Sequence, residues 1–217
     1  MSPASYLTAP PRVVVSNLAI RFLWFNTSAI ALFVALAAAG SAYAGCGYVH
    51  KPPRDGQIGT APLAIGDSVM YGAAWRLAHH GFESDARCGR SPRGGIYLLQ
   101  RRKRRGTLPE IVVVALGTNY FITDGQVATM LRVLGRHRTL MLVTPFRSFR
   151  PVSNGPMRRA AQRWPRRVTL IDWSRLASSH HYWFWGDGTH MRPLALDHYW
   201  RLLRRAVWSR QRGRLVM

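Results

Sequence analysis

Three short motifs contain the residue types that nucleophilic catalysis by serine requires. Ser68 ends the motif Gly-Asp-Ser directly after an apolar run, and a serine hydroxyl needs a neighbouring base because it is a weak nucleophile at neutral pH. His190 is the candidate base, and Asp187, three residues earlier, can hold the imidazole in the required tautomer. Asn119 ends the motif Gly-Thr-Asn and offers an amide donor for a developing oxyanion.

Each of these residues also has a purely structural interpretation. Ser68 and the aspartate before it suit the N-cap of a helix, and Asn119 suits a turn in the left-handed conformation. His190 is one of eight histidines, most of which we expect to be ordinary surface residues. The assignment to catalysis therefore depends on the fold bringing the motifs together.

A second oxyanion donor is expected from a glycine backbone amide after the second predicted strand. Gly89 is the candidate, and Gly94 and Gly95 in the same region are alternatives. Gly89 could equally be an ordinary turn glycine.

The histidine and cysteine spacings predict no metal site. His180 and His181 precede Asp187 and His190, but this spacing fits no common ligand set. We expect neither a metal nor another cofactor.

Apolar runs alternate with helical patterns, which predicts a doubly wound α/β sandwich around a parallel sheet. The continuous run Ile111 to Leu116 is typical of a strand buried on both faces. The predicted strands are 63–66, 82–88, 111–116, 139–143 and 168–171, and the predicted helices are 69–80, 95–105, 124–134, 154–164 and 194–207, with a loop before the last helix.

The predicted topology brings two distant motifs together. In a five-stranded sheet of order 2-1-3-4-5, strands one and three are neighbours, and ligands bind at their carboxyl ends. Ser68 follows strand one and Asn119 follows strand three. The later loop with Asp187 and His190 can fold over the same edge.

The N-terminal segment differs in composition from the rest of the chain. Residues 22–44 are almost uncharged and rich in alanine, and Arg12 and Arg21 precede them. This pattern predicts either a secretory signal cleaved after Ala44 or an uncleaved anchor in the inner membrane. We therefore expect three parts: 1–44 as signal or anchor, 45–60 as a linker, and 61–217 as one exported or membrane-tethered catalytic domain.

The chain has two cysteines, Cys46 and Cys88. In an oxidising compartment they could form a disulfide between the segment after the signal and the sheet. Two free thiols, or lipidation of Cys46, are the alternatives.

The formal net charge of +22, mostly from arginine, is compatible with anionic lipid headgroups or acidic glycans as partners. A solvated basic surface with no partner explains it equally well. Nucleic acid is not expected, because the basic run at 100–105 has no interleaved aromatic residues and no recognition module is present.

Four motifs, in order, resemble the four blocks of the SGNH or GDSL-type hydrolases, over roughly residues 61 to 205. They contain Ser68, Gly89, Asn119 and His190. The resemblance implies a flavodoxin-like three-layer sandwich and a serine esterase that uses no cofactor. It implies that Ser68 attacks an ester carbonyl, that His190 acts as general base and acid, and that Asp187 orients it. The Ser68 and Gly89 amides and the Asn119 side chain would form the oxyanion hole.

Two departures narrow the resemblance. Val69 replaces the leucine of the GDSL signature, and Tyr120 stands where many members have aspartate. The flanking residues are most similar to SGNH domains attached to membrane acyltransferases of surface glycans. We therefore expect an enzyme acting on short acyl esters, with an acylated small molecule or a glycan of the cell envelope as substrate. It would be either a hydrolase or an O-acyltransferase with the same triad.

A non-catalytic basic domain that binds envelope glycan or lipid is the alternative from another class. It would use the basic surface and the aromatic run Tyr182 to Trp185, either as a sugar-stacking platform or as a plug in the core.

Overall fold

The computed structural model describes residues 46–56, 58–150 and 152–215. The predicted export segment, 22–44, lies outside this part of the chain. Within the described part, every helix is too short or too polar to cross a bilayer.

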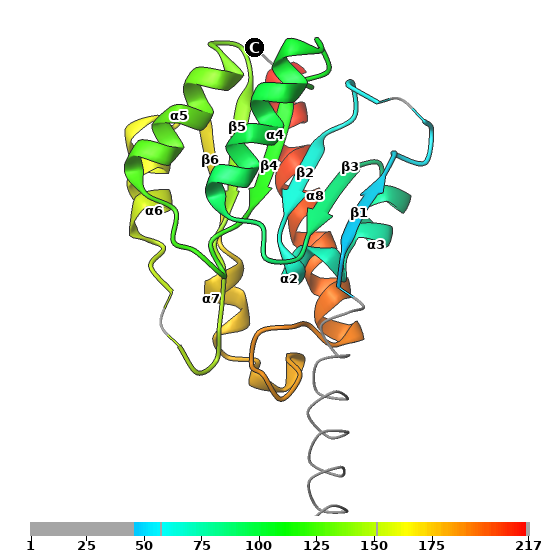
Figure 1. The fold of residues 1–217 in the computed structure, drawn as a ribbon, viewed down its shortest axis with the longest axis vertical. Helices are drawn as coiled ribbons and strands as arrows, with labels where there is room; N and C mark the ends of the chain where they lie inside the picture. The colour runs from blue at the N-terminus through cyan, green and yellow to red at the C-terminus, as the bar shows by residue number, and fades with distance from the viewer. Residues whose placement is uncertain (1–45, 57, 151, 216–217) are drawn as a thin grey trace, which may run out of the picture. The chain divides into compact units, whose positions relative to one another are not determined.

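A mostly parallel sheet of six strands forms the centre of the fold, in the order β1-β3-β2-β4-β5-β6 (Figure 1). Strand β1 pairs with β3 in the antiparallel direction, and the other neighbours pair in parallel. The strands are β1 Tyr48–Lys51, β2 Leu63–Gly66, β3 Glu83–Arg87, β4 Ile111–Ala115, β5 Thr139–Val143 and β6 Val168–Ile171.

The sheet therefore differs from the five-stranded prediction by its edge strand. Strand β1 lies in the segment 45–60 that the sequence predicts to be a linker. A disulfide between Cys46 and Cys88, with Cα atoms 5.7 Å apart, fixes the start of β1 to the end of β3. This pairing decides between the alternatives for the two cysteines and leaves no thiol at Cys46 for lipidation.

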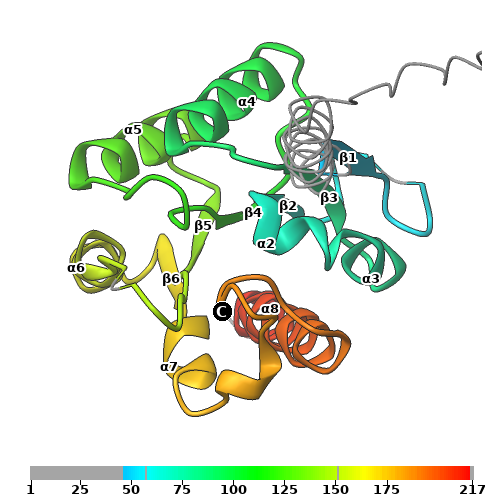
Figure 2. The ribbon, with the colours of Figure 1, turned by 60° about the horizontal axis from the view of Figure 1, so that its bottom comes forward.

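Helices cover both faces of the sheet (Figure 2). Apolar side chains of α4, α5 and α6 pack on one face, and those of α3, α7 and α8 pack on the other. The helices are α2 Ser68–Tyr71, α3 Ala74–His79, α4 Pro92–Arg104, α5 Asp124–Leu134, α6 Gly155–Arg163, α7 Trp173–Ala177 and α8 Pro193–Leu215, with a 3-10 turn, η1, at His181–Trp183.

The alternation of side chains along the strands explains this layering. In β2, Leu63 and Ile65 join the core under α4 and α5, whereas Ala64 faces the core under α8. Both faces are buried, and β2 and β4 are accordingly apolar throughout, as in other parallel sheets. Strand β3 differs, because it includes the buried polar residues Glu83, Ser84 and Asp85.

The predicted helix 69–80 is divided into α2 and α3. Gly72 ends α2, and a Cβ atom at this position would lie 3.3 Å from Leu196 of α8. The close approach of α8 thus favours glycine here, and glycine weakens a helix interior. The segment predicted as a loop before the last helix also contains α7 and η1.

Candidate active site

Ser68 begins α2 directly after β2, at the carboxyl edge of the sheet. Asp67 is the N-cap of α2, because its carboxylate accepts a hydrogen bond from the Val69 amide at 3.0 Å. The Ser68 hydroxyl is therefore not the cap, and it is available for another partner. Gly66 permits the turn, since a Cβ there would lie 2.3 Å from the Cβ of Met70.

The Ser68 hydroxyl oxygen lies 3.0 Å from Nε2 of His190. The other ring nitrogen of His190, Nδ1, lies 2.5 Å from a carboxylate oxygen of Asp187. The three residues thus form a continuous chain of hydrogen bonds across 122 positions of sequence. In this chain, the imidazole can take the serine proton while the carboxylate stabilises the imidazolium.

Asp187 also shapes the loop that carries His190. One carboxylate oxygen accepts hydrogen bonds from the backbone amides of Thr189 and His190, at 2.8 and 2.9 Å, and the other faces the imidazole. Partial burial by itself would raise the pKa of Asp187, but the hydrogen bonds from His190 and Thr189 outweigh it and lower the pKa. The carboxylate is consequently ionised throughout the neutral range.

The aromatic run beside this loop is divided between core and surface. Trp183 and Phe184 are buried, whereas Tyr182 and Trp185 are more than half exposed. Phe184 forms a β-bridge with Met191, and the Trp185 amide donates to the His190 carbonyl at 2.9 Å. The buried pair therefore anchors the loop that carries Asp187 and His190 to the core.

Comparisons with solved structures identify the fold. The C-terminal catalytic domain of peptidoglycan O-acetyltransferase A from Streptococcus pneumoniae matches with a TM-score of 0.61 and 21% identity, over 71% of this chain and 96% of that domain. A lipolytic G-D-S-L family protein from Veillonella parvula has a TM-score of 0.51, 13% identity and coverage of 68% and 96%. A carbohydrate esterase family 3 protein from Talaromyces cellulolyticus has a TM-score of 0.50, 15% identity and coverage of 69% and 97%.

The chain has the SGNH hydrolase fold. Among curated proteins, the "Putative peptidoglycan O-acetyltransferase YrhL" of Bacillus subtilis (strain 168) is 28% identical over 134 residues, which are 60% of this chain. The chain spans about a fifth of that protein's length, 21%. No family model matches the sequence.

The expected oxyanion donors of this SGNH fold lie at the same sheet edge as Ser68. Asn119 is exposed in the turn after β4, and Gly89 has a positive φ of 69° in the turn after β3. The amides of Gly94 and Gly95 both donate to Ser91, at 3.2 and 3.1 Å, within the first turn of α4. Of the three candidate glycines, Gly89 is the one whose amide donates to no acceptor within the described part of the chain.

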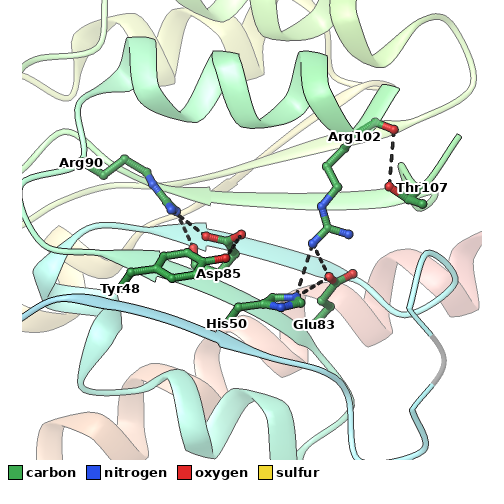
Figure 3. Close-up of polar contacts among 7 residues, drawn as sticks. All are labelled: Tyr48, His50, Glu83, Asp85, Arg90, Arg102 and Thr107. Atoms are coloured by element: carbon green, nitrogen blue, oxygen red, sulfur yellow. Dashed lines mark hydrogen bonds and ion pairs between the residues drawn. The ribbon is translucent and has the colours of Figure 1, made fainter. Parts of the chain in front are cut away.

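Arg90 is a site residue that the sequence analysis missed. It is buried, and its guanidinium donates to the carbonyl and the carboxylate of Asp85, each at 2.6 Å (Figure 3). The guanidinium also donates to the Gly66 carbonyl at 3.3 Å. The hydroxyl of Tyr48 donates to the same carboxylate at 3.2 Å. Arg90 thus links the turn that carries Gly89 to the strand that ends at the serine. Asp85, in the middle of a buried strand, is the sequence feature that could have indicated a buried cation here, because a buried carboxylate needs a partner.

Asp67 is a second buried group of the SGNH site. Burial raises the pKa of Asp67, and hydrogen bonds from Val69 and Thr118 oppose the increase only in part. One of its carboxylate oxygens has no hydrogen-bond partner among the described residues.

His180 and His181 take no part in the hydrogen-bonded chain of Ser68, His190 and Asp187, and the His181 ring centroid lies 6.0 Å from that of Phe146. His180 stacks on Trp183, with ring centroids 4.0 Å apart. In the described part of the chain, no three His, Cys, Asp or Glu side chains are grouped so that they could hold a metal ion.

Proposed function

We propose that this protein is a serine acyl-ester enzyme, in which Ser68 attacks a short acyl ester and becomes acylated. The observation that carries the proposal is the hydrogen-bonded chain from Ser68 through His190 to Asp187, with distances of 3.0 and 2.5 Å. His190 removes the serine proton and then protonates the leaving alkoxide. The tetrahedral oxyanion is stabilised by the amides of Ser68 and Gly89 and by the side chain of Asn119.

The substrate that we propose is an acyl ester of a cell-envelope carbohydrate. Two relatives support it, since the names of the pneumococcal domain and the Bacillus protein both refer to peptidoglycan O-acetyltransferases. An exported location, with residues 22–44 as signal or anchor, fits the Cys46–Cys88 disulfide, because disulfides persist in oxidising compartments. The catalytic domain would then be the segment 61–217, preceded by β1.

Two reactions share the proposed acyl-serine. Water as the acceptor gives an esterase, and a sugar hydroxyl gives an O-acyltransferase. The esterase is our first candidate, because the serine, histidine and oxyanion donors suffice for hydrolysis. The names of the two relatives favour the transferase as the second candidate.

Turnover of p-nitrophenyl acetate by the purified chain tests the serine mechanism. We expect Ser68→Ala to remove the activity and retain the fold, because the hydroxyl is not the cap of α2. Ser209→Ala is a control that removes an exposed hydroxyl on α8. Full turnover by Ser68→Ala would contradict the mechanism.

Free acetate and acetate transferred to an added envelope polysaccharide are then measured in one reaction. Acetate release that is unaffected by the polysaccharide supports the esterase. Acetylated polysaccharide formed at the expense of free acetate supports the transferase.

A further inference from the structure

A cavity of about 850 Å³ lies next to Gly89, one of the proposed oxyanion donors. It is formed where β1, the end of β3 and the first turns of α4 meet. Its lining includes Tyr48, Arg87, Gly89, Gly94, Tyr97 and Arg101. Parallel pairing sets Gly66 opposite Ala86, so Gly89 and Ser68 leave adjacent strands at the same edge. Gly89 is thus the residue that the cavity shares with the proposed reaction centre, and Ser68 and His190 lie outside the cavity lining.

The charges around this cavity are unbalanced. Asp85 neutralises Arg90 beneath it through the buried ion pair, but Arg87 at the end of β3 is exposed. The Nε atom of Arg101 is buried and has no hydrogen-bond partner among the described residues. A buried donor without a partner is costly, and an anion bound in the cavity would satisfy it.

The N-terminus of α4 adds positive potential to the same cavity. Ser91 and Gly94 line it, and the first turn of this thirteen-residue helix contains no acidic side chain. A helix N-terminus favours negative charge. Together with the two arginines, it makes the cavity suitable for a carboxylate or a phosphate.

Two tyrosine rings at the cavity are available for contact with a sugar. Tyr48 and Tyr97 are 55% and 61% exposed. The Tyr48 hydroxyl donates to Asp85, and the Tyr48 ring lies beside the buried pair in Figure 3. Exposed tyrosine rings combine an apolar face with a polar edge, which matches the alternating surfaces of a sugar ring.

We propose that this cavity is a subsite for a negatively charged sugar, carrying a carboxylate or a phosphate, of the same glycan whose acyl ester reacts at Ser68. Arg87 and Arg101 bind the anionic group, and Tyr48 and Tyr97 contact the ring. This inference rests on the proposed function for its glycan, but the subsite can be tested without catalysis.

Binding to the full chain carrying Ser68→Ala is measured by titration with three oligosaccharides: a uronic-acid oligosaccharide, a phosphorylated one and a neutral one of equal length. We expect one or both anionic ligands to bind more tightly than the neutral one. Adding Arg87→Gln and Arg101→Gln should weaken anionic binding by roughly ten- to hundredfold, the range for hydrogen bonds to charged groups. Neutral binding should change little.

Lys103→Gln with Arg104→Gln is the matched control. Both residues are exposed on α4 and outside the cavity lining, and the control removes the same two charges. Equal weakening by the control and the cavity variant would show a general charge effect and would overturn the subsite. Equal affinity of the anionic and neutral ligands would also overturn it. If the variant with Arg101→Gln does not fold, the binding titration is repeated with Arg87→Gln alone, because Arg87 is exposed.

The two proposals fail in different ways. Loss of anionic binding in the cavity variant, with binding retained by the Lys103→Gln and Arg104→Gln control, supports the subsite. If Ser68→Ala retains full turnover, the proposed catalytic mechanism fails, but selective anionic binding that depends on Arg87 and Arg101 still supports the subsite.

Discussion

The guanidinium of Arg90 donates a hydrogen bond to the carbonyl oxygen of Gly66, 3.3 Å away. Gly66 ends β2 two residues before the serine, and Arg90 follows the candidate oxyanion donor Gly89. The contact therefore connects the proposed nucleophile and the proposed oxyanion donor through one side chain. Its other partner, Asp85, is fully buried and depends on Arg90 for neutralisation.

We expect Arg90→Ala to destabilise the protein by roughly 3–5 kcal/mol, because it leaves a buried carboxylate without its counterion. The double variant Arg90→Met with Asp85→Leu should recover much of this free energy of unfolding, since it removes both charges. Urea denaturation measures both. If the double variant is no more stable than Arg90→Ala, the buried charge is not the cause. We expect the double variant to turn over p-nitrophenyl acetate more slowly than the native protein, because it still lacks the hydrogen bond from Arg90 to the Gly66 carbonyl.

Asp187→Asn should reduce kcat by roughly 10⁴-fold, the scale seen when an orienting carboxylate of a triad becomes an amide. The amide can still accept from the Thr189 and His190 backbones, so the loop should keep its shape. Asp197→Asn is the control, since Asp197 pairs with Arg76 on α3, away from the triad. Steady-state kinetics with p-nitrophenyl acetate provide the measurement. A loss below tenfold would argue against a role for Asp187 in orienting His190.

Asn119→Ala should lower kcat by roughly 10²- to 10³-fold and leave KM nearly unchanged, the usual effect of removing one oxyanion donor. Because Asn119 is exposed, thermal stability should change little. Asn154→Ala, which removes an amide that donates to the Pro145 carbonyl instead, is the control. An unchanged kcat for Asn119→Ala would contradict the role of Asn119 as an oxyanion donor and leave it only a structural role in the turn.

The apolar runs of the sequence predict the buried strands β2, β4 and β5 well, because strands buried on both faces are nearly continuous apolar runs. Strand β1 does not show such an apolar run. It has four residues, lies at the edge, and includes the partly exposed His50 and Lys51. Its position depends on pairing with β3 and on the disulfide, which are contacts distant in sequence. Helix α7 is likewise too short, at five residues, to show a helical period.

The candidate site could be predicted where topology alone positions the residues. Ser68 and Asn119 follow adjacent strands, so the strand order brings them to one edge. The contact of His190 with Ser68 depends further on the loop anchored by Trp183 and Phe184. The link from Arg90 to Gly66 could not be predicted, because the Gly66 carbonyl becomes a neighbour of Arg90 only when β2 and β3 pair.

Asp67 predicts an unusual dependence of stability on pH. Burial raises the pKa of its carboxyl in the folded protein, so the folded state binds more protons than the unfolded state between the two pKa values. Stability then falls as pH rises from the unfolded pKa, about 4, through the raised folded pKa. Asp67→Asn removes this titration and keeps an acceptor for the Val69 amide.

We therefore expect the stability of Asp67→Asn relative to the native protein to increase from pH 4 to pH 7. Chemical denaturation at several pH values measures it, with Asp55→Asn as an exposed control. A difference that is constant with pH, or that decreases toward neutral pH, would contradict the assignment.

The Cys46–Cys88 disulfide should stabilise the domain through the 42-residue separation that it closes. Cys46→Ser with Cys88→Ser should lower the free energy of unfolding by about 2–4 kcal/mol, because the unfolded chain regains the freedom that the bridge removes. Cys88 also adjoins Gly89, the proposed oxyanion donor. The same variant should therefore lower kcat for p-nitrophenyl acetate and leave KM nearly unchanged. Denaturation with and without a reductant provides the measurement, and the serine variant is the control because its stability should not respond to the reductant. Equal stability of the oxidised and reduced native protein would contradict a stabilising role for the bridge.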